Sequence, residues 1–421
     1  MRILLLAPHP FYAERGTPIA VLLAATALCR AGHEVDVLAF HEGIDVSLPG
    51  LRVLRIAAPP GVRQVPIGFS WKKVVCDLWL AFAAWRAMRA RRYDVLHAVE
   101  ESVFLGLPLS AWFRVPLIYD MDSVLSQQLA GRWPKMRRAL ASLGSLERVA
   151  IRRADCVIAV CQAIADHVGD LGRRDHVHVV TDVAFPLPAG VWPIAYPHDD
   201  DANDLRALFD SHAPLALYIG NLERHQGIDL LLESLAALPD AVPCHLVVAG
   251  GTSMAVRHYQ DRAAALSVGS RVRFTGVHAL GRLPSLLAQA DILCSPRLAG
   301  INTPMKVYSY MLAGRAIIAT DIVSHRQVLD ETCARLVLPE VSAFSAGLHL
   351  LASDVAMREA LGRAAFARAR ENHGFDTFER RLAAAYDGLA PHGKVDCAPG
   401  RSSRGVPYAP ESGDRDQQGT G

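Results

Sequence analysis

Short runs rich in Val, Ile and Leu alternate with helix-length amphipathic segments along this chain, from its first residue to about residue 340. Gly, Pro or charged residues bound each run, and this alternation is typical of parallel sheets covered by helices on both faces. A first set of predicted strands comprises 3–6, 34–39, 51–56, 95–98, 116–119, 156–160 and 176–180. A second set comprises 215–220, 245–249, 271–275, 292–295, 316–320 and 334–338. The pattern predicts an α/β fold with two parallel sheets.

The restart of the pattern indicates two domains. The chain has 421 residues, and a single hydrophobic core stops growing near about 250–300 residues. Between the two sets lies a stretch with four prolines and the acidic run Asp199–Asp201, which is typical of a linker. We predict an N-terminal domain over 1–185, a linker over 186–205 and a C-terminal domain over 206–374. An amphipathic helix over 375–390 follows, and 393–421 is predicted to be disordered.

Composition excludes several classes of protein. The 44 Lys and Arg residues nearly balance the 42 Asp and Glu residues, which argues against a nucleic-acid-coating protein, and 51% hydrophobic residues argue against global disorder. The apolar stretch Ile19–Cys29 is too short to span a bilayer, and the apolar run after Met1-Arg2 is too short for a secretory signal. Eight cysteines without a CxxC pair favour reduced core residues and a cytoplasmic location.

The first predicted strand is followed by a loop that ends in Gly16-Thr17-Pro18. Thr17 is predicted as the N-cap and Pro18 as the first residue of a helix that continues to about Arg30. Gly16 lets the backbone approach a ligand, and the helix N-terminus favours an anion. From this loop alone, a turn that binds phosphate or a sugar hydroxyl and a simple chain reversal remain equally open. The chain has no GxGxxG here, so a nicotinamide enzyme loses its main support.

The second domain carries a sharper pattern. Its first strand ends at Gly220-Asn221, and Gly227 precedes a helix, which predicts a backbone-lined anion site at the carboxyl edge of the sheet. Further along, Asn302-Thr303 lead into a short helix with Lys306 in its first turn. A cation there opposes the helix dipole unless an anion is bound. We therefore favour a ligand role for Lys306 over a side chain that merely extends to solvent.

Three segments together resemble a known family. Residues 304–314, followed by 317–320, look like the donor-binding motif of the family-four, group-one retaining glycosyltransferases, and the glycine segments 220–227 and 16–18 fall where that family has its other two glycine motifs. The resemblance covers about residues 1–390. It implies the GT-B fold, in which two Rossmann-like domains face a cleft and the last helix packs on the first domain. It also implies no metal and no bound cofactor, a nucleotide-diphosphate sugar as co-substrate on the C-terminal domain, and an acceptor on the N-terminal domain.

The sequence departs from the family at several positions. The paired glutamates that usually hold the transferred sugar and the ribose would fall on Ile301 and Ser309, and the Arg and Lys that usually hold the diphosphate would fall on Asn221 and Gln226. In the first domain, Asp122 takes the place of the His of a His-Asp pair.

Departure of the diphosphate during sugar transfer builds negative charge, which fixed cations and helix N-termini stabilise. Members of the family are thought to let the departing phosphate accept the acceptor's proton, so paired carboxylates are not required. The candidate catalytic residues are Lys306, Arg224 and Asp122. The candidate donor-binding residues are Gly16, Thr17, Gly220, Asn221, Gln226, Gly227, Asn302, Thr303 and Ser309.

Other patterns are weaker. Asp120-Met121-Asp122 has the DxD form that holds a metal in other glycosyltransferases, but a motif this short is common by chance. A nucleophile-elbow hydrolase lacks its Gly-x-Ser-x-Gly motif. Residues 71–92 and 132–153 are basic, and both contain tryptophan. Two interpretations of them remain open: peripheral contact with the anionic inner face of the cytoplasmic membrane, or apolar faces packed on the sheet beneath solvated charges. An RNA surface is less favoured, and no nucleic acid is expected.

These observations predict a metal-independent hexosyltransferase-type enzyme. It would transfer a sugar from a nucleotide diphosphate, with retention, to a glycan, lipid-linked or small-molecule acceptor. The alternative is a catalytically inactive GT-B-like protein that binds a sugar nucleotide or serves as a scaffold. A GT-B sugar-nucleotide epimerase is a third reading, but it would need carboxylates that the donor motifs lack.

Overall fold

The computed structural model describes residues 1–66, 70–126, 137–188, 191–194, 204–239 and 241–389, with the side chains of 137–142 and 174 left aside. The predicted linker 186–205 therefore falls largely outside the described residues, as do the segment 132–136 and the tail 393–421. Residues 1–389 form one compact unit.

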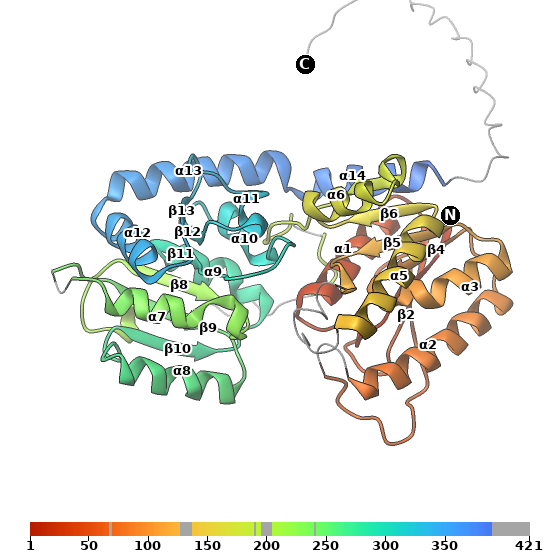
Figure 1. Ribbon diagram of the computed structural model, residues 1–421, viewed down its shortest axis with the longest axis horizontal. Helices are drawn as coiled ribbons and strands as arrows, with labels where there is room; N and C mark the ends of the chain where they lie inside the picture. The colour runs from red at the N-terminus through yellow and green to blue at the C-terminus, as the bar shows by residue number, and fades with distance from the viewer. Residues whose placement is uncertain (67–69, 127–136, 189–190, 195–203, 240, 390–421) are drawn as a thin grey trace, which may run out of the picture. The chain divides into compact units, whose positions relative to one another are not determined.

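The N-terminal part contains a parallel seven-stranded sheet (Figure 1). Its strands, in spatial order, are β3 (Leu51–Arg55), β2 (Glu34–Ala39), β1 (Arg2–Ala7), β4 (Val95–Val99), β5 (Leu117–Met121), β6 (Cys156–Ala159) and β7 (Val177–Val179). The strand order reverses between β1 and β4. At such a switch point the loops at the carboxyl edge diverge and leave room for a ligand.

Helices cover both faces of this sheet, because strands of a parallel sheet carry apolar side chains on each face. α1 (Gly16–Arg30) and α14 (Phe375–Asp387) pack on one face. The other face is covered by α2 (Trp71–Ala90), α3 (Val103–Phe113), α5 (Arg137–Arg153) and α6 (Gln162–Asp170). The short helices η1 (Glu100–Ser102) and η3 (Arg174–His176) follow β4 and precede β7. The prediction that the last helix returns to the first domain is confirmed.

The C-terminal part contains a parallel six-stranded sheet with the same kind of order reversal, here between β8 and β11. Its strands are β10 (Val272–Gly276), β9 (His245–Ala249), β8 (Leu215–Ile219), β11 (Ile292–Ser295), β12 (Ala316–Thr320) and β13 (Arg335–Val337). One face packs on α7 (Ile228–Ala236), α8 (Ser253–Ala265) and α12 (Val341–Ser353), and the other on α9 (Leu283–Gln289), α10 (Met305–Leu312) and α13 (Val355–Asn372). The remaining elements are α11 (Val323–Arg326), η4 (Arg206–Leu208), η5 (Arg224–Gln226) and η6 (Leu280–Arg282). The fold prediction of two Rossmann-like domains is confirmed.

Two local predictions need correction. Thr17 is not the N-cap of α1, because the helix begins at Gly16 with Arg15 as the capping residue and no side-chain cap. Thr17 instead lies near the Asp122 carboxyl, where burial raises the pKa of that group and the Thr17 hydroxyl, which favours the charged form, acts to lower it. Of the two interpretations left open for residues 71–92, packing on the sheet does not hold for Val74, Leu78 and Phe82, whose side chains are exposed.

Candidate donor site and acceptor edge

The strongest candidate site lies at the switch point of the six-stranded sheet. The loop after β8 carries Gly220 and η5, and the loop after β11 leads into α10. β8 and β11 are neighbours in the sheet, so these two loops emerge side by side at its carboxyl edge. Ligands of open α/β sheets bind at this edge.

Lys306 lies in the first turn of α10, as predicted, and its amine is buried between the two loops. Its Nζ donates to Gln226 Oε1 at 3.2 Å and lies 3.8 Å from the centre of the Tyr218 ring. No ion pair links Lys306 to a carboxylate of the described residues. Burial lowers its pKa well below the usual range, and the nearby Arg297 guanidinium lowers it further. The amine is therefore a largely enclosed basic group with no anionic partner among the described residues.

Arg297 is a second buried cation, and the sequence analysis did not identify it. Its guanidinium donates from Nε to Ala299 O at 2.7 Å, from Nη1 to Asn302 O at 3.0 Å and from Nη2 to Asn302 Oδ1 at 3.1 Å. Burial also lowers the pKa of Arg297. Gly300 has φ +128°, and a Cβ there would lie 2.1 Å from Arg297 Nη2, so the loop closes tightly over the guanidinium.

Small residues and polar side chains shape the space around the Lys306 amine. A Cβ at Gly220 would lie 3.3 Å from Lys306 Nζ and 3.1 Å from Tyr218 Oη, so glycine keeps the approach to the amine open. Tyr218 Oη donates to Asn221 O at 2.5 Å and fixes the turn after β8. The Gln226 amide faces His225 Nε2 at 2.9 Å, which leaves its oxygen toward Lys306.

Buried polar contacts also fix the ends of β11 and β12. Ser295 Oγ lies 2.8 Å from His325 Nε2, and His325 Nδ1 lies 2.7 Å from Thr320 O. Thr320 Oγ1 donates to Arg297 O. Burial lowers the pKa of His325 to about 4, so the ring is neutral at ordinary pH, with Nδ1–H donating and Nε2 accepting. This network holds the backbone that presents Arg297.

The structure brings only some of the predicted donor residues together. Lys306, Gln226 and Gly220 surround one point, and Asn302 joins them through Arg297. Arg224 lies in η5 with an exposed side chain. Within the described part of the chain, the other predicted residues form no hydrogen bond with the Lys306 amine. Asn221 and Gly227 lie in the loop after β8, where Asn221 Oδ1 accepts from Glu223 N and Gly227 packs against Pro296 O. Ser309 Oγ accepts from Phe185 N at 3.1 Å, and Thr303 is buried beside Tyr308.

Acidic side chains gather at the carboxyl edge of the other sheet. Glu100 follows β4, Asp122 follows β5 and Asp182 follows β7. Burial raises the pKa of Glu100 and of Asp182 to about 7. Burial and the neighbouring Asp120 raise the pKa of Asp122 well above the usual range. Carboxyl groups in this state both donate and accept hydrogen bonds, which suits recognition of hydroxyl groups.

The returning helix α14 orients this acidic edge. Tyr386 Oη lies 2.6 Å from His97 Nδ1, and His97 Nε2 lies 3.1 Å from Asp120 Oδ2. With Nε2–H donating to the Asp120 carboxylate, Nδ1 accepts a hydrogen bond from the Tyr386 hydroxyl. The helix therefore fixes the imidazole, and the imidazole fixes Asp120. Among the described residues, no group of three or more His, Cys, Asp and Glu side chains is arranged to hold a metal ion.

Two parallel sheets, each with an order reversal and with charged side chains at its carboxyl edge, form the architecture of the GT-B class of proteins. Solved structures agree on the fold. Sucrose-phosphate synthase from Thermosynechococcus elongatus superimposes with a TM-score of 0.75 at 19% identity, over 92% of this chain and 98% of the other. HepE from Anabaena, solved with UDP-glucose, has a TM-score of 0.69 at 18% identity, over 92% and 99%.

Sequence comparison then gives the family. Residues 15–181 match Glycosyltransferase Family 4, and residues 213–354 match Glycosyl transferases group 1. The chain belongs to the group-one, family-four glycosyltransferases, and it is an enzyme of this class. A phosphatidyl-myo-inositol mannosyltransferase from Mycolicibacterium smegmatis is 26% identical over 80% of this chain and 81% of its own length. A D-inositol 3-phosphate glycosyltransferase from Mycolicibacterium gilvum is 26% identical over 67% of this chain and 64% of its own length.

Proposed function

We propose that this glycosyltransferase uses a nucleotide-diphosphate sugar and binds its diphosphate between Lys306 and Arg297. The observation that carries the proposal is a pair of basic side chains, the Lys306 amine and the Arg297 guanidinium, that have no carboxylate partner among the described residues and lie at the switch point of the sheet. Burial and the Arg297 guanidinium disfavour the charged form of the Lys306 amine, and a bound dianion would favour that form and compensate both groups. HepE, which shares the fold, was solved with UDP-glucose.

In this mechanism the two cations lower the barrier to departure of the diphosphate. Cleavage of the anomeric C–O bond transfers charge to the leaving phosphate, and fixed positive groups in a dry site stabilise that charge strongly. A departing phosphate oxygen would take the proton of the attacking acceptor hydroxyl. Retention is inferred from the family resemblance. No step requires a resident metal or cofactor, because Lys306 and Arg297 supply the positive charge.

We propose a polyhydroxylated acceptor at the acidic edge of the seven-stranded sheet. Asp122 and Glu100 would hydrogen-bond its hydroxyl groups, and Asp122 would orient the attacking one. Two relatives are named for inositol-containing acceptors, one of them a lipid. A cyclitol headgroup on a lipid combines these features, and we propose it as the acceptor class.

Calorimetry with nucleotide diphosphates, combined with a transfer and hydrolysis assay, tests the proposal. We expect binding of one nucleotide diphosphate, stabilisation by mass action, and turnover with a cyclitol acceptor. Binding without transfer or hydrolysis over a broad set of acceptors would instead support the inactive sugar-nucleotide-binding alternative. Absence of binding by any nucleotide diphosphate would contradict the site.

Diphosphate binding is expected to take up a proton. Burial lowers the pKa of Lys306 in the free protein, and a bound anion would raise it. Between the free and the bound pKa, the complex holds more protons, so affinity falls as pH rises, by up to about tenfold per pH unit. Titration calorimetry in two buffers with different ionisation enthalpies measures this uptake. Equal heats in both buffers would show that the Lys306 amine does not change its protonation on binding.

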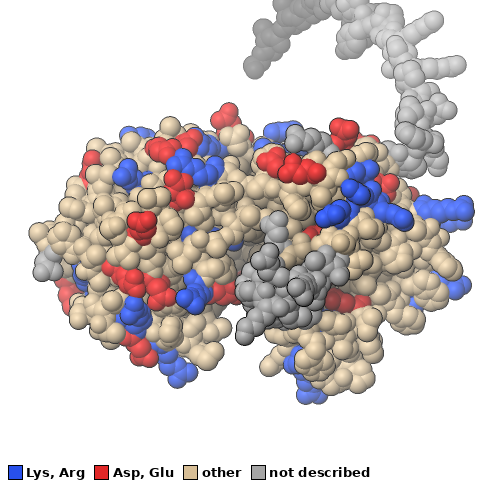
Figure 2. Space-filling model, in the orientation of Figure 1, with Lys and Arg blue, Asp and Glu red and all other residues tan. Residues whose placement is uncertain are grey.

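We further propose that α2 places the enzyme on a membrane surface. Trp71, Leu78 and Phe82 are 64%, 61% and 59% exposed on this helix, and Trp112 of the neighbouring α3 is 78% exposed. The surface over α2 and α3 is largely uncharged in Figure 2. At the start of α2, Lys73 Nζ donates to Pro8 O at 3.0 Å, so this face begins beside the acceptor edge. No helix of the described residues could span a membrane.

Replacing both Leu78 and Phe82 by glutamine is expected to weaken binding to lipid vesicles by about tenfold or more, because each buried apolar side chain contributes about 1.5–3 kcal/mol. Co-sedimentation with vesicles measures the loss. Transfer to a soluble acceptor should be unchanged, since both residues point away from the sheet. Unchanged vesicle binding would contradict the proposal. A variant that is monomeric in solution, where the unaltered protein is dimeric, would show that the face packs against protein instead.

A further inference from the structure

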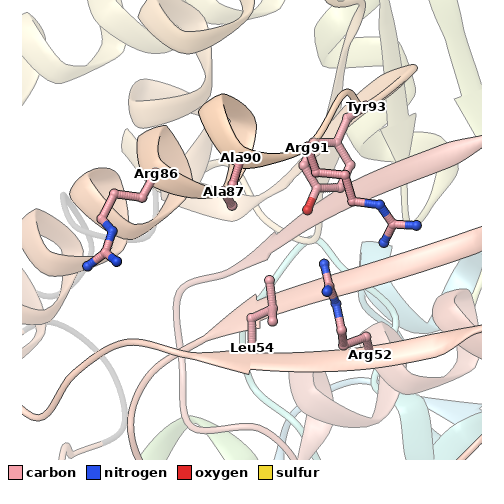
Figure 3. A pocket seen from close by; sticks show the side chains of 7 residues that line it. All are labelled: Arg52, Leu54, Arg86, Ala87, Ala90, Arg91 and Tyr93. Atoms are coloured by element: carbon pink, nitrogen blue, oxygen red, sulfur yellow. The ribbon is translucent and has the colours of Figure 1, made fainter.

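A second pocket lies at the opposite edge of the seven-stranded sheet (Figure 3). It has a volume of about 420 Å³ and is lined by β3 and by the end of α2. Arg52, Arg86 and Arg91 supply its charged groups, Leu54, Ala87 and Ala90 supply apolar surface, and no lining residue is acidic. Arg91 directly follows α2 and precedes β4, so the pocket is at the amino edge, away from the acidic acceptor edge.

Two of these arginines are fixed by carboxylates beneath them. The Asp36 side chain is only 3% exposed, and it accepts from Arg52 Nε at 3.0 Å and from Arg91 Nη1 at 3.3 Å. Glu34 pairs with Arg91 from the side. A guanidinium has five N–H donors, and the Arg52 side chain is still 53% exposed. The carboxylates thus hold Arg52 and Arg91 in a fixed orientation, and Arg52 keeps N–H donors that can bind a ligand.

Arg86 differs from the other two. It lies on the far side of Ala87 and Ala90 from Arg52 and Arg91 in Figure 3, and its guanidinium lies 6.0 Å from the centre of the Phe82 ring. Among the described residues, no carboxylate forms an ion pair with it. No hydrogen bond to another described residue uses its donors, so they can contact a ligand. The three guanidinium groups outnumber the two carboxylates that contact them, so the pocket carries excess positive charge.

We propose that this pocket binds the phosphate group of an anionic phospholipid. Planar guanidinium groups recognise phosphate through paired hydrogen bonds. The position of the pocket on α2 indicates that the phosphate belongs to a lipid. Val74, Leu78, Phe82 and Arg86 follow one another at four-residue spacing, and all are exposed. The apolar face of α2 thus leads directly into the pocket. The proposal concerns lipid recognition and does not depend on the diphosphate site.

The full-length protein provides a matched pair of variants. Arg86→Gln removes a pocket cation, whereas Arg89→Gln removes an exposed cation one turn further along α2, which lies over the Trp85 ring at 4.9 Å and does not line the pocket. On vesicles of phosphatidylglycerol in phosphatidylcholine, loss of one surface cation should weaken binding about fivefold. Loss of charge-assisted hydrogen bonds should add about tenfold or more for Arg86→Gln alone.

Equal losses in the two variants would overturn the proposal, because they would show attraction by surface charge only. A second arm titrates inorganic phosphate and soluble glycerophosphoglycerol. Saturable binding of inorganic phosphate, lost in Arg86→Gln, with no difference between the two variants on vesicles, would reassign the pocket to a free phosphate and overturn the lipid source. Sugar transfer to a soluble acceptor should be unchanged in Arg86→Gln, so failure here is separable from failure of the proposed reaction.

Discussion

Replacing Lys306 by methionine is expected to weaken nucleotide-diphosphate binding by about 100-fold or more and, at the same time, to stabilise the ligand-free protein. The loss of affinity follows because a buried charge-assisted contact to an anion contributes about 3 kcal/mol when one partner is removed. The gain in stability follows because unfolding returns the amine to water, where it is protonated, whereas the fold holds it dry without a carboxylate partner. A residue whose purpose was packing would show the two effects with the same sign.

Calorimetry and thermal melting of the same variant measure the two effects, and Arg224→Met is the matched control. Arg224 is a cation of the neighbouring loop, but its side chain is exposed, so its loss should change affinity by no more than about fivefold. Unchanged affinity in Lys306→Met would show that the diphosphate binds elsewhere. A larger loss in Arg224→Met than in Lys306→Met would move the site to η5.

Much of the fold could be predicted from the sequence because buried parallel strands carry a local signal. The strands 34–39, 245–249, 292–295 and 316–320 have the predicted bounds, and the others differ by only one or two residues at either end. Lys306 could be found for a different reason: a cation in the first turn of a helix contradicts the helix dipole, and such local conflicts mark sites.

Arg297 could not be found in this way. In the sequence it follows a proline in a polar loop, where an arginine is usually exposed. Only the tertiary structure shows that Asn302 and Ala299 enclose its guanidinium beneath Gly300. The nearby Gly300 is the one available signal, since a glycine in a polar loop can mark a close approach of backbone to another group.

The outward face of α2 was ambiguous for a related reason. Both sides of this helix carry apolar residues at four-residue spacing: Cys76, Leu80, Ala84 and Met88 are buried, whereas Val74, Leu78 and Phe82 are exposed. Periodicity identifies an apolar stripe but does not say what covers it. The stripe from Cys76 to Met88 packs on the sheet, whereas the stripe with Leu78 and Phe82 is exposed. Packing on the sheet is therefore excluded for the exposed stripe, and contact of this stripe with a membrane stays a proposal.

The second large effect is expected at Gly227, the residue between η5 and α7. Its φ is +76°, and a Cβ there would lie 1.9 Å from Pro296 O. Alanine therefore meets two penalties: an unfavourable backbone conformation of about 1–2 kcal/mol, and a clash with backbone that cannot rotate away. We expect Gly227→Ala to lose about 3 kcal/mol or more of stability, and we expect the clash to displace the segment that presents Arg297.

Gly276 separates the two penalties, because its φ is +71° and nothing lies within 4 Å of the position of its Cβ. Gly276→Ala should therefore show the conformational cost alone, in urea unfolding monitored on both variants, and should bind nucleotide diphosphate normally. Gly227→Ala should unfold at clearly lower urea and bind the nucleotide more weakly, since Pro296 immediately precedes Arg297 in the chain. If the two variants lose stability equally and both keep full affinity, the loop after β11 yields to the methyl group, and a rigid cation pair is not what binds the diphosphate.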